Sequence, residues 1–301
     1  MLDLIIIGAG PAGITAAVYA ARRNMSILVV TKDIGGQAAI SGDVENYTGY
    51  QFITGPELAI KFQAHMSKYN IEIKENEEII KIEKEGDLIR VTSDKGSYQA
   101  KTIIVASGKR SKKLNVPGEK EFKNRGLTYC ATCDGPLFAQ KEVAVIGGGN
   151  SSLDAAIQLM NIAKKVYIVN INSVVEGDAI MQEKLHGNDK VIILNNSQVE
   201  AVLGDKMVNG LRIKREGKQE TLAVQGIFVE IGLIPNSEFA KILDRNEFGE
   251  IKINFHNQTN ISGFFAAGDV TDVPEKQIII ACGEGSKACL SVFKYLATHK
   301  I

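Results

Sequence analysis

The chain has 301 residues, of which 45% are apolar, enough for the cores of about two domains of ordinary size. Its 35 Lys and Arg residues balance 35 Asp and Glu residues, so neither nucleic acid nor an acidic membrane surface is an expected partner. There is no charged leader and no apolar run of about 18 residues, so we expect a cytoplasmic protein without a membrane span.

Residues 4–30 predict a strand, a glycine-rich turn, a helix and a second strand. The turn has the pattern Gly-x-Gly-x-x-Gly, and the Ala-rich helix follows it at 14–22. The glycines of such a turn let the backbone approach a pyrophosphate, whose charge the helix N-terminus stabilises. Thr31 follows the second strand, where an acid for the ribose hydroxyls is usual. The expected dinucleotide contacts in the turn are Gly8, Gly10, Pro11, Ala12 and Gly13.

The next part of the chain predicts mixed structure that leads to a domain crossover. In order, the pattern indicates loops at 35–37 and 44–49, an amphipathic helix at 56–69, a β-meander at 71–100 and a buried strand at 102–105. The strand ends at Ala106-Ser107-Gly108. The basic run that follows marks the crossover, and it is also a candidate docking surface for an acidic protein: Lys109, Arg110, Lys112 and Lys113.

A pair of cysteines follows this crossover. Cys130 and Cys133 lie two residues apart, and Asp134 follows directly. Such a pair can cycle between a short-loop disulfide and two thiols. A zinc site would need more ligands than the four scattered His residues provide, so we predict a redox dithiol and no metal. Cys282 and Cys289 lie among small residues and are expected to be buried.

Residues 143–170 repeat the opening pattern at an offset of 139 residues. The matched pairs are Ile7 and Ile146, Gly8 and Gly147, Gly10 and Gly149, Ala16 and Ala155, and Ala17 and Ala156. This second unit is expected to continue in strands at 191–194, 199–202, 210–214 and 226–231, with the chain returning at 233–236. The chain therefore holds two units of one design.

The last part of the chain predicts a strand at 251–254, a strand leading into Ala267-Gly268-Asp269, and a long helix at 283–299. An acid after such a strand is placed to hydrogen-bond a cofactor hydroxyl. The alternative is that Asp269 only caps a helix or a turn.

These motifs together resemble the low-molecular-weight thioredoxin reductases. The resemblance rests on the first glycine-rich turn, Gly35-Gly36-Gln37, Cys130-Ala131-Thr132-Cys133-Asp134 and Ala267-Gly268-Asp269. The second half is similar to the flavoprotein component of alkyl hydroperoxide reductase, which carries an extra N-terminal dithiol domain. Since this sequence starts at the flavin domain, we expect its disulfide substrate to be a separate, thioredoxin-like protein.

The resemblance implies an α/β fold of two Rossmann-like, three-layer dinucleotide-binding domains, one inserted in the other. FAD would bind residues 1–112 and 244–301, and the inserted NAD(P)-binding-like domain, 113–243, would carry the dithiol. The family also implies a homodimer. Its FAD-binding positions correspond to Gly8, Gly10, Pro11, Ala12, Gly13, Thr31, Gly35, Gly36, Gln37, Asn46, Ala106, Gly108, Gly268, Asp269, Lys276, Gln277 and Ile278.

By the same resemblance, each residue of the redox motif has a role. Cys133 would face the flavin, Cys130 would attack the substrate disulfide, and Asp134 would give and take the thiol protons. Thiolate attack needs a base nearby, so this assignment is chemically consistent. The alternative for Asp134 is a helix N-cap.

Three features of the second unit argue against NAD(P)H. Ser152 stands at the third glycine position, and Asn170 stands where an NADH-binding unit would have Asp or Glu. Residues 166–183 contain no Lys, Arg or His, although a 2′-phosphate favours an Arg fork. We therefore predict a thioredoxin reductase that receives its electrons from ferredoxin.

The sequence leaves three alternative functions open. Asn170 is able to hydrogen-bond a ribose, so an NAD(P)H-dependent reductase of thioredoxin or of a peroxiredoxin stays open. A reductase between ferredoxin and NADP would not need Cys130 and Cys133, so the dithiol disfavours it. The last alternative is a flavoprotein that senses redox state without catalysing a reaction.

Overall fold

The computed structural model describes residues 1–41 and 43–299, and the side chains of Asp43 and Cys133 lie outside this description. The chain divides into two compact units: Met1–Arg110 joined by the chain from Ile234 onward, and Ser111–Leu233 inserted between them. The predicted domain boundary at 243/244 lies later than this division, whereas the predicted return of the chain at 233–236 lies at it. Ala240 and Leu243 pack into the core of the first unit, which explains why the segment from Ile234 groups with that unit.

The first unit is built on a mixed sheet with the strand order β5-β2-β1-β8-β7-β6, and β19 pairs with β8. Its central strands are parallel, and Ile6 of β1 lies opposite Val29 of β2 and Ile104 of β8. The strands are β1 (Leu2–Ala9), β2 (Ile27–Ile34), β5 (Glu72–Lys74), β6 (Ile79–Glu85), β7 (Leu88–Ser93), β8 (Ser97–Val105) and β19 (Phe264–Ala266).

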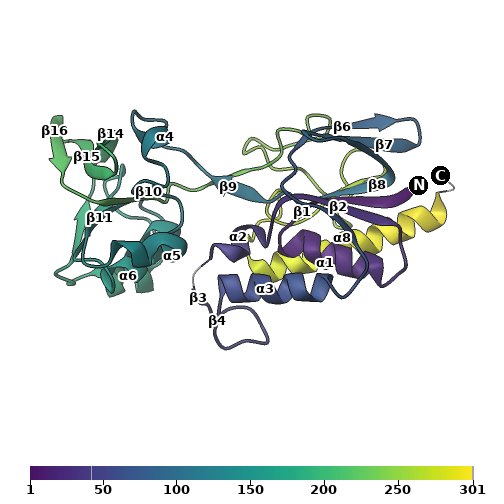
Figure 1. Ribbon diagram of the computed structural model, residues 1–301, viewed down its shortest axis with the longest axis horizontal. Helices are drawn as coiled ribbons and strands as arrows, with labels where there is room; N and C mark the ends of the chain where they lie inside the picture. Colours follow the sequence, from purple (N-terminus) through teal and green to yellow (C-terminus); the bar gives the residue numbers. More distant parts are fainter. Residues whose placement is uncertain (42, 300–301) are drawn as a thin grey trace. The chain divides into compact units, whose positions relative to one another are not determined.

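Both faces of the parallel core are covered, which explains the continuous apolar run in β1. Leu4 and Ile6 face a core shared with three helices, α1 (Pro11–Ala21), α3 (Gly55–Met66) and α8 (Ile278–Thr298), which lie on one side of the sheet in Figure 1. Ile5 and Ile7 face a second core, to which β6 and β7 contribute.

Several elements of the first unit differ from the sequence-based expectation. The segment at 72–74 pairs in parallel with β2 at the sheet edge, so it does not belong to the meander. The last meander strand and the expected buried strand form the single strand β8. Residues Gly36–Ala39 form the short helix α2, which overlaps the loop expected at 35–37. No strand forms at 251–254, where Ile251 makes only isolated bridges.

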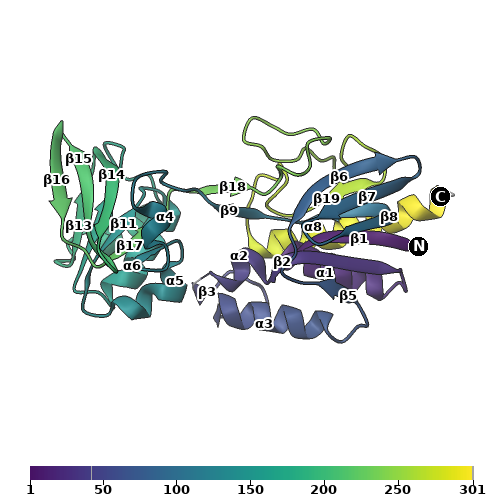
Figure 2. The same cartoon turned by 45° about the horizontal axis from the view of Figure 1, so that its top comes forward.

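The second unit contains a parallel sheet with the order β10-β17-β11-β12-β13 and an antiparallel sheet β14-β15-β16, both visible in Figure 2. The parallel strands are β10 (Leu127–Thr128), β11 (Glu142–Ile146), β12 (Lys165–Val169), β13 (Val191–Leu194) and β17 (Gly226–Val229). The antiparallel strands are β14 (Ser197–Gly204), β15 (Val208–Arg215) and β16 (Lys218–Leu222). The helical segments are α4 (Glu119–Phe122), α5 (Ala131–Asp134), η1 (Gly135–Phe138), α6 (Asn150–Met160) and α7 (Ala179–Leu185).

The internal repeat is visible in the backbone. Helix α1 spans Pro11–Ala21 and α6 spans Asn150–Met160, so both boundaries keep the offset of 139. The residue before each helix is an extended glycine, with ψ of −173° at Gly10 and −172° at Gly149. The predicted duplication of the strand–turn–helix unit is therefore confirmed.

The chain passes between the units through β9 (Lys109–Ser111) and β18 (Leu233–Pro235), which pair as a two-stranded sheet. A further small pair, β3 (Asp43–Val44) and β4 (Ile53–Thr54), precedes α3, whose N-terminus has a capping box between Thr54 and Glu57. Among residues 1–41 and 43–299, no helix has the length and apolarity needed to cross a membrane.

Candidate functional site

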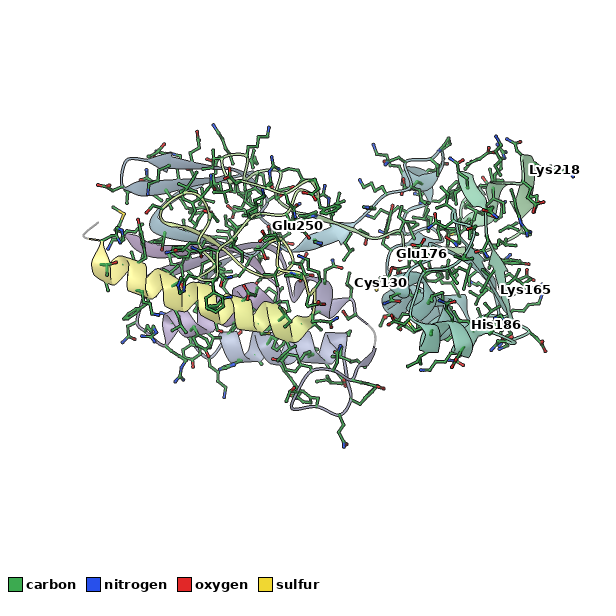
Figure 3. All side chains as sticks on the ribbon, turned by 180° about the vertical axis from the view of Figure 1, so that it is seen from behind. Cys130, Lys165, Glu176, His186, Lys218 and Glu250 are labelled. Atoms are coloured by element: carbon green, nitrogen blue, oxygen red, sulfur yellow. The ribbon has the colours of Figure 1, made fainter. Side chains whose placement is uncertain are left out.

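Cys130, which is labelled in Figure 3, lies in the second unit between strand β10 and the short helix α5. Cys130 is partly exposed and is disulfide-bonded. The predicted site residue Cys133 lies in α5, and its side chain is outside the described part of the structure. The loop therefore presents Cys130 in its oxidised form.

Thr128 organises this loop through one hydroxyl group. Its oxygen accepts a hydrogen bond from the backbone N–H of Cys130 at 3.2 Å, and its proton is donated to Oδ2 of Asp134. Asp134 precedes η1 but makes no side-chain cap hydrogen bond there, so the N-cap alternative finds no support. The sequence reasoning missed Thr128, whose only signal was a hydroxyl residue two positions before the first cysteine.

Glu119 fixes the other side of the loop. Its carboxylate accepts hydrogen bonds from the Tyr129 hydroxyl at 2.6 Å and from the backbone N–H groups of Leu114 and Asn115 at 2.6 and 2.7 Å. Burial, followed by this contact with Glu119, raises the pKa of Tyr129, so the phenol stays protonated as a donor. The residue next to Cys130 is thus tied to the start of the second unit.

A polar chain joins the cysteine loop to helix α6. The Thr132 hydroxyl donates to Oε1 of Gln158 at 2.9 Å, and Nε2 of Gln158 donates to Asp154 at 2.8 Å. Near the same helix end, burial raises the pKa of Glu230 to about 7, with Ser151 opposing the rise and Asp154 adding to it. Two carboxyl groups, those of Asp154 and Glu230, therefore lie at the N-terminal part of α6.

In the first unit, the backbone of the glycine-rich turn packs too closely to carry a side chain at two of its positions. Gly8 has a φ of +101°, and a Cβ there would lie 2.5 Å from the carbonyl oxygen of Ala106. A Cβ on Gly13 would lie 1.9 Å from the Gly8 carbonyl oxygen. Helix α1 has no side-chain cap at Gly10, so its first N–H groups are available to an anion.

The other predicted FAD-binding residues come from several distant parts of the chain. A Cβ on Gly36 would lie 3.2 Å from the Cα of Gly10, which brings the 35–37 segment against the turn. A Cβ on Gly268 would lie 3.0 Å from the Cβ of Ala12. Nδ2 of Asn46 donates to the side chain of Gln277 at 3.1 Å, directly before α8. These residues fit FAD, because the first backbone N–H groups of α1 have no side-chain cap and several of the residues carry polar side chains.

Thr31 and Asp269 differ in their surroundings. The Thr31 hydroxyl accepts a hydrogen bond from the Ala9 N–H at 3.1 Å and donates one to the Asp33 carbonyl at 2.5 Å. This hydroxyl is therefore already hydrogen-bonded within the protein. Burial raises the pKa of Asp269, while the nearby Lys276 and Lys109 oppose the rise.

Both of these lysines bind Glu250, at 2.9 Å for Lys109 and 3.0 Å for Lys276. Burial would raise the pKa of Glu250, but hydrogen bonds from Lys109, Asn246 and Lys276 outweigh it and lower the value to about 2. Arg110, another residue of the basic run, pairs with Glu238 at 2.5 Å. Two of the four cations considered for docking are therefore engaged within the first unit.

Other residues of the second unit lie against its glycine-rich turn. Asn170 is 1% exposed, and its Nδ2 donates to Asn195 and to the carbonyl groups of Asn172 and Val174, while its Oδ1 accepts from the Asn172 N–H. A Cβ on Gly148 would lie 2.3 Å from this Oδ1.

The segment after β12 folds back onto this turn. The Glu176 N–H donates to the Gly148 carbonyl at 2.6 Å, and the Asp178 N–H donates to Oδ1 of Asn150 at 2.7 Å. Glu176 is labelled in Figure 3. Acidic residues therefore stand beside the turn where a dinucleotide phosphate would require positive charge.

The remaining cysteines are buried, as expected. Cys282 is 9% and Cys289 0% exposed, and both thiols are free. Burial raises the pKa of Cys282 and raises that of Cys289 to about 12, which suppresses thiolate formation. No cluster of metal-ligating side chains occurs among the residues that the structure describes.

Comparisons with known proteins agree with this arrangement. Residues 2–285 match the family described as pyridine nucleotide-disulphide oxidoreductase. The chain is 40% identical over 298 residues to a protein named NADH dehydrogenase from Bacillus subtilis, covering 98% of this chain and 58% of that protein. It is 42% identical over 301 residues to a component of the alkyl hydroperoxide reductase of Pseudomonas putida, covering 98% of this chain and 58% of that protein.

Solved structures show the same fold along the whole chain. Thioredoxin reductase from Lactococcus lactis superposes with a TM-score of 0.92 at 34% identity, covering 99% of this chain and 100% of that one. Ferredoxin-flavin thioredoxin reductase from Clostridium acetobutylicum gives 0.55 at 31% identity, covering 99% of each chain. The chain spans just under three fifths of the length of the two curated relatives, 58% of each.

Proposed function

The chain belongs to the pyridine nucleotide-disulphide oxidoreductases, and we propose that it is an FAD-dependent reductase of a thioredoxin-like protein disulfide. The observation that carries this proposal is the loop in which Thr128 binds both the backbone of Cys130 and the carboxylate of Asp134. A cysteine pair with a positioned carboxylate is suited to thiol–disulfide exchange. The unit Met1–Arg110 with the chain from Ile234 onward would hold FAD, and the inserted unit carries the dithiol.

The chemistry divides between cofactor and chain. Bound FAD accepts electrons singly or in pairs and delivers a pair to a disulfide. In the chain, Cys130 attacks the substrate disulfide, Cys133 resolves the mixed disulfide and receives electrons from the flavin side, and Asp134 exchanges protons with the thiols. The family likeness supports these roles, and we propose them for this chain together with a cytoplasmic homodimer.

Single cysteine variants test the dithiol mechanism. Cys133→Ser leaves the attacking thiol without its resolving partner, so it should accumulate a mixed disulfide with a thioredoxin-like substrate. Cys130→Ser should trap poorly. The adducts are measured by non-reducing electrophoresis and mass spectrometry. If both variants retained turnover, the dithiol mechanism would be excluded. This result would also exclude a non-enzymatic redox sensor that works through the dithiol.

We further propose that the electron donor is a ferredoxin, not a nicotinamide nucleotide. Asn170, which stands at the ribose position, uses its carboxamide to bind Asn172, Val174 and Asn195. The segment around Glu176 is acidic and is hydrogen-bonded to the glycine-rich turn. A ribose or a 2′-phosphate would have to displace these contacts and would meet no Arg or Lys in residues 166–183.

The second candidate is an NADH-dependent reductase of a thioredoxin or a peroxiredoxin. Two relatives at 40% and 42% identity favour it, since one is named NADH dehydrogenase and the other is named as part of an alkyl hydroperoxide reductase. Residues 150–160 keep an uncapped helix N-terminus in the second unit, which is the remaining feature of a phosphate site.

Anaerobic bleaching of the flavin separates the two donors. The FAD-loaded protein is mixed in a stopped-flow spectrometer with reduced ferredoxin, NADH or NADPH at micromolar concentrations. We expect ferredoxin to bleach the flavin rapidly and both nucleotides to leave it yellow. Rapid bleaching by NADH or NADPH would replace the ferredoxin proposal by the second candidate.

A further inference from the structure

Thr128 makes two hydrogen bonds that span the whole cysteine motif. It is the last residue of β10, which is paired with β17, and its side chain is buried at 6% exposure. The hydroxyl contacts the Cys130 N–H at one end of the motif and Oδ2 of Asp134 at the other. One group on a paired strand thus fixes both ends of a short helical loop.

The direction of these bonds follows from the chemistry of the groups. A backbone N–H only donates, so the Thr128 oxygen must accept from Cys130. The single hydroxyl proton of Thr128 is then the one donated to Oδ2 of Asp134. This arrangement holds Oδ2 of the Asp134 carboxylate at the end of the cysteine motif.

We propose that Thr128 is a positioning residue, which orients the Asp134 carboxylate for proton exchange with the dithiol. The inference rests on the proposed function, in which Asp134 carries these protons. In the exchange, the Cys130 thiolate attacks one substrate sulfur and the first substrate thiolate leaves. Cys133 then attacks Cys130 and releases the second substrate thiolate. The two protons of the dithiol end on the two substrate thiols, and two electrons pass to the substrate.

The test compares Thr128→Val, which keeps the shape and removes the hydroxyl, with Thr128→Ser, which keeps the hydroxyl. The reduced full-length protein is alkylated with iodoacetamide across a pH series, and its exchange with a chromogenic aromatic disulfide is followed. Thr128→Val should slow the rate of this single exchange reaction about tenfold and displace the pH profile of alkylation. Thr128→Ser should restore both to within about twofold.

A second pair of variants keeps the test decisive. Asp134→Asn should displace the pH profile in the same way, and adding Thr128→Val to it should produce no further change, because both act through one carboxylate. If Val is not tolerated in the fold, Thr128→Ala removes the same hydroxyl. A wild-type pH profile in the folded Val or Ala variant, additive effects in the double variant, or failure of Ser to restore activity would overturn the proposal.

The same measurements separate this inference from the proposed function. Alkylation reports on the thiols whether or not a thioredoxin is the substrate. A wild-type protein that reduces no thioredoxin-like disulfide would remove the proposed function, while the alkylation profiles of the Thr128 variants would still decide the role of Thr128.

Discussion

Glu250 shows how a single side chain can join distant parts of the first unit. It holds the ammonium groups of Lys109 and Lys276, which are far apart in the sequence, and its pKa is lowered to about 2. Lys276 also donates to the Thr271 carbonyl at 2.5 Å, close to Asp269. The stability of the first unit should therefore depend on the charge of Glu250.

The lowered pKa gives a prediction with a defined sign. Because the folded pKa lies below the unfolded one, Glu250 stabilises the fold above about pH 5, and this contribution is lost as the pH falls toward about 2. Glu250→Gln should lower the free energy of unfolding by up to about 3 kcal/mol at pH 7. The loss should shrink in urea melts near pH 3.

An exposed ion pair provides the matched control. Glu85 binds Arg90 at 2.6 Å with 40% of its side chain exposed, and solvent screens such a pair, so Glu85→Gln should leave the unfolding free energy almost unchanged at either pH. Equal losses in the two variants, or a loss at Glu250 that is independent of pH, would contradict the role assigned to Glu250.

At the residue scale, sequence patterns indicated the groups that we propose to carry the chemistry and missed the residues that hold them. The spacing of Cys130 and Cys133 and the acid that follows are a local pattern. Thr128, Glu119 and Glu250 act through contacts that only the fold creates, such as the bond from Lys109 to Glu250 across 141 positions. No periodicity or motif in a single sequence encodes such a pairing.

At the element scale, the two strand–turn–helix units allow a matched comparison of the equivalent glycines Gly10 and Gly149. A Cβ on Gly10 would meet only the Cα of Gly36 at 4.0 Å, and a Cβ on Gly149 would meet nothing within 4 Å. An alanine at either position should therefore be compatible with the fold of its unit. Its methyl group would nevertheless stand in the space over the helix N-terminus that a pyrophosphate approaches.

We expect Gly10→Ala to weaken FAD binding at least about tenfold, measured by flavin fluorescence, with the melting temperature of the FAD-free protein unchanged. Gly149→Ala should leave both FAD affinity and ferredoxin-driven turnover as in the wild type. A loss of turnover in Gly149→Ala with intact FAD would indicate a nucleotide at the second turn and would favour the NADH-dependent alternative.

The helix and strand boundaries show where periodicity fails. Helix α8 begins at Ile278, five residues before the expected start at 283. Gly285 is needed there, since a Cβ would lie 2.0 Å from the Ala12 carbonyl oxygen of α1. The strand expected at 251–254 has the right residues, but Ile251 finds only isolated bridges as partners.

A second prediction at the element scale concerns the tie between the cysteine loop and the segment before α4. Glu119→Gln keeps the shape but carries only one carbonyl acceptor for the three donors at Tyr129, Leu114 and Asn115. We expect it to destabilise the second unit by about 1–3 kcal/mol, measured by urea unfolding. Tyr129→Phe, which removes one donor, should cost less, and the reverse order would contradict this tie.

At the scale of the whole molecule, the predicted α/β fold of two dinucleotide-binding units is confirmed, as is the likeness to thioredoxin reductases. The duplication and the glycine-rich turns made this possible from the sequence, because both are local patterns that repeat. The electron donor could not be predicted from such local patterns. It depends on how the segment around Glu176 folds over the second turn, and relatives at similar identity carry different names.

The central claim is that electrons from the flavin reach the cysteine pair. The FAD-loaded protein is photoreduced without oxygen, alkylated in acid, and the peptides carrying Cys130 and Cys133 are quantified by mass spectrometry, with the FAD-depleted Gly10→Ala chain as control. The account predicts that both thiols appear in the loaded protein and that the disulfide persists in the control. A fully bleached flavin beside an intact disulfide would contradict it.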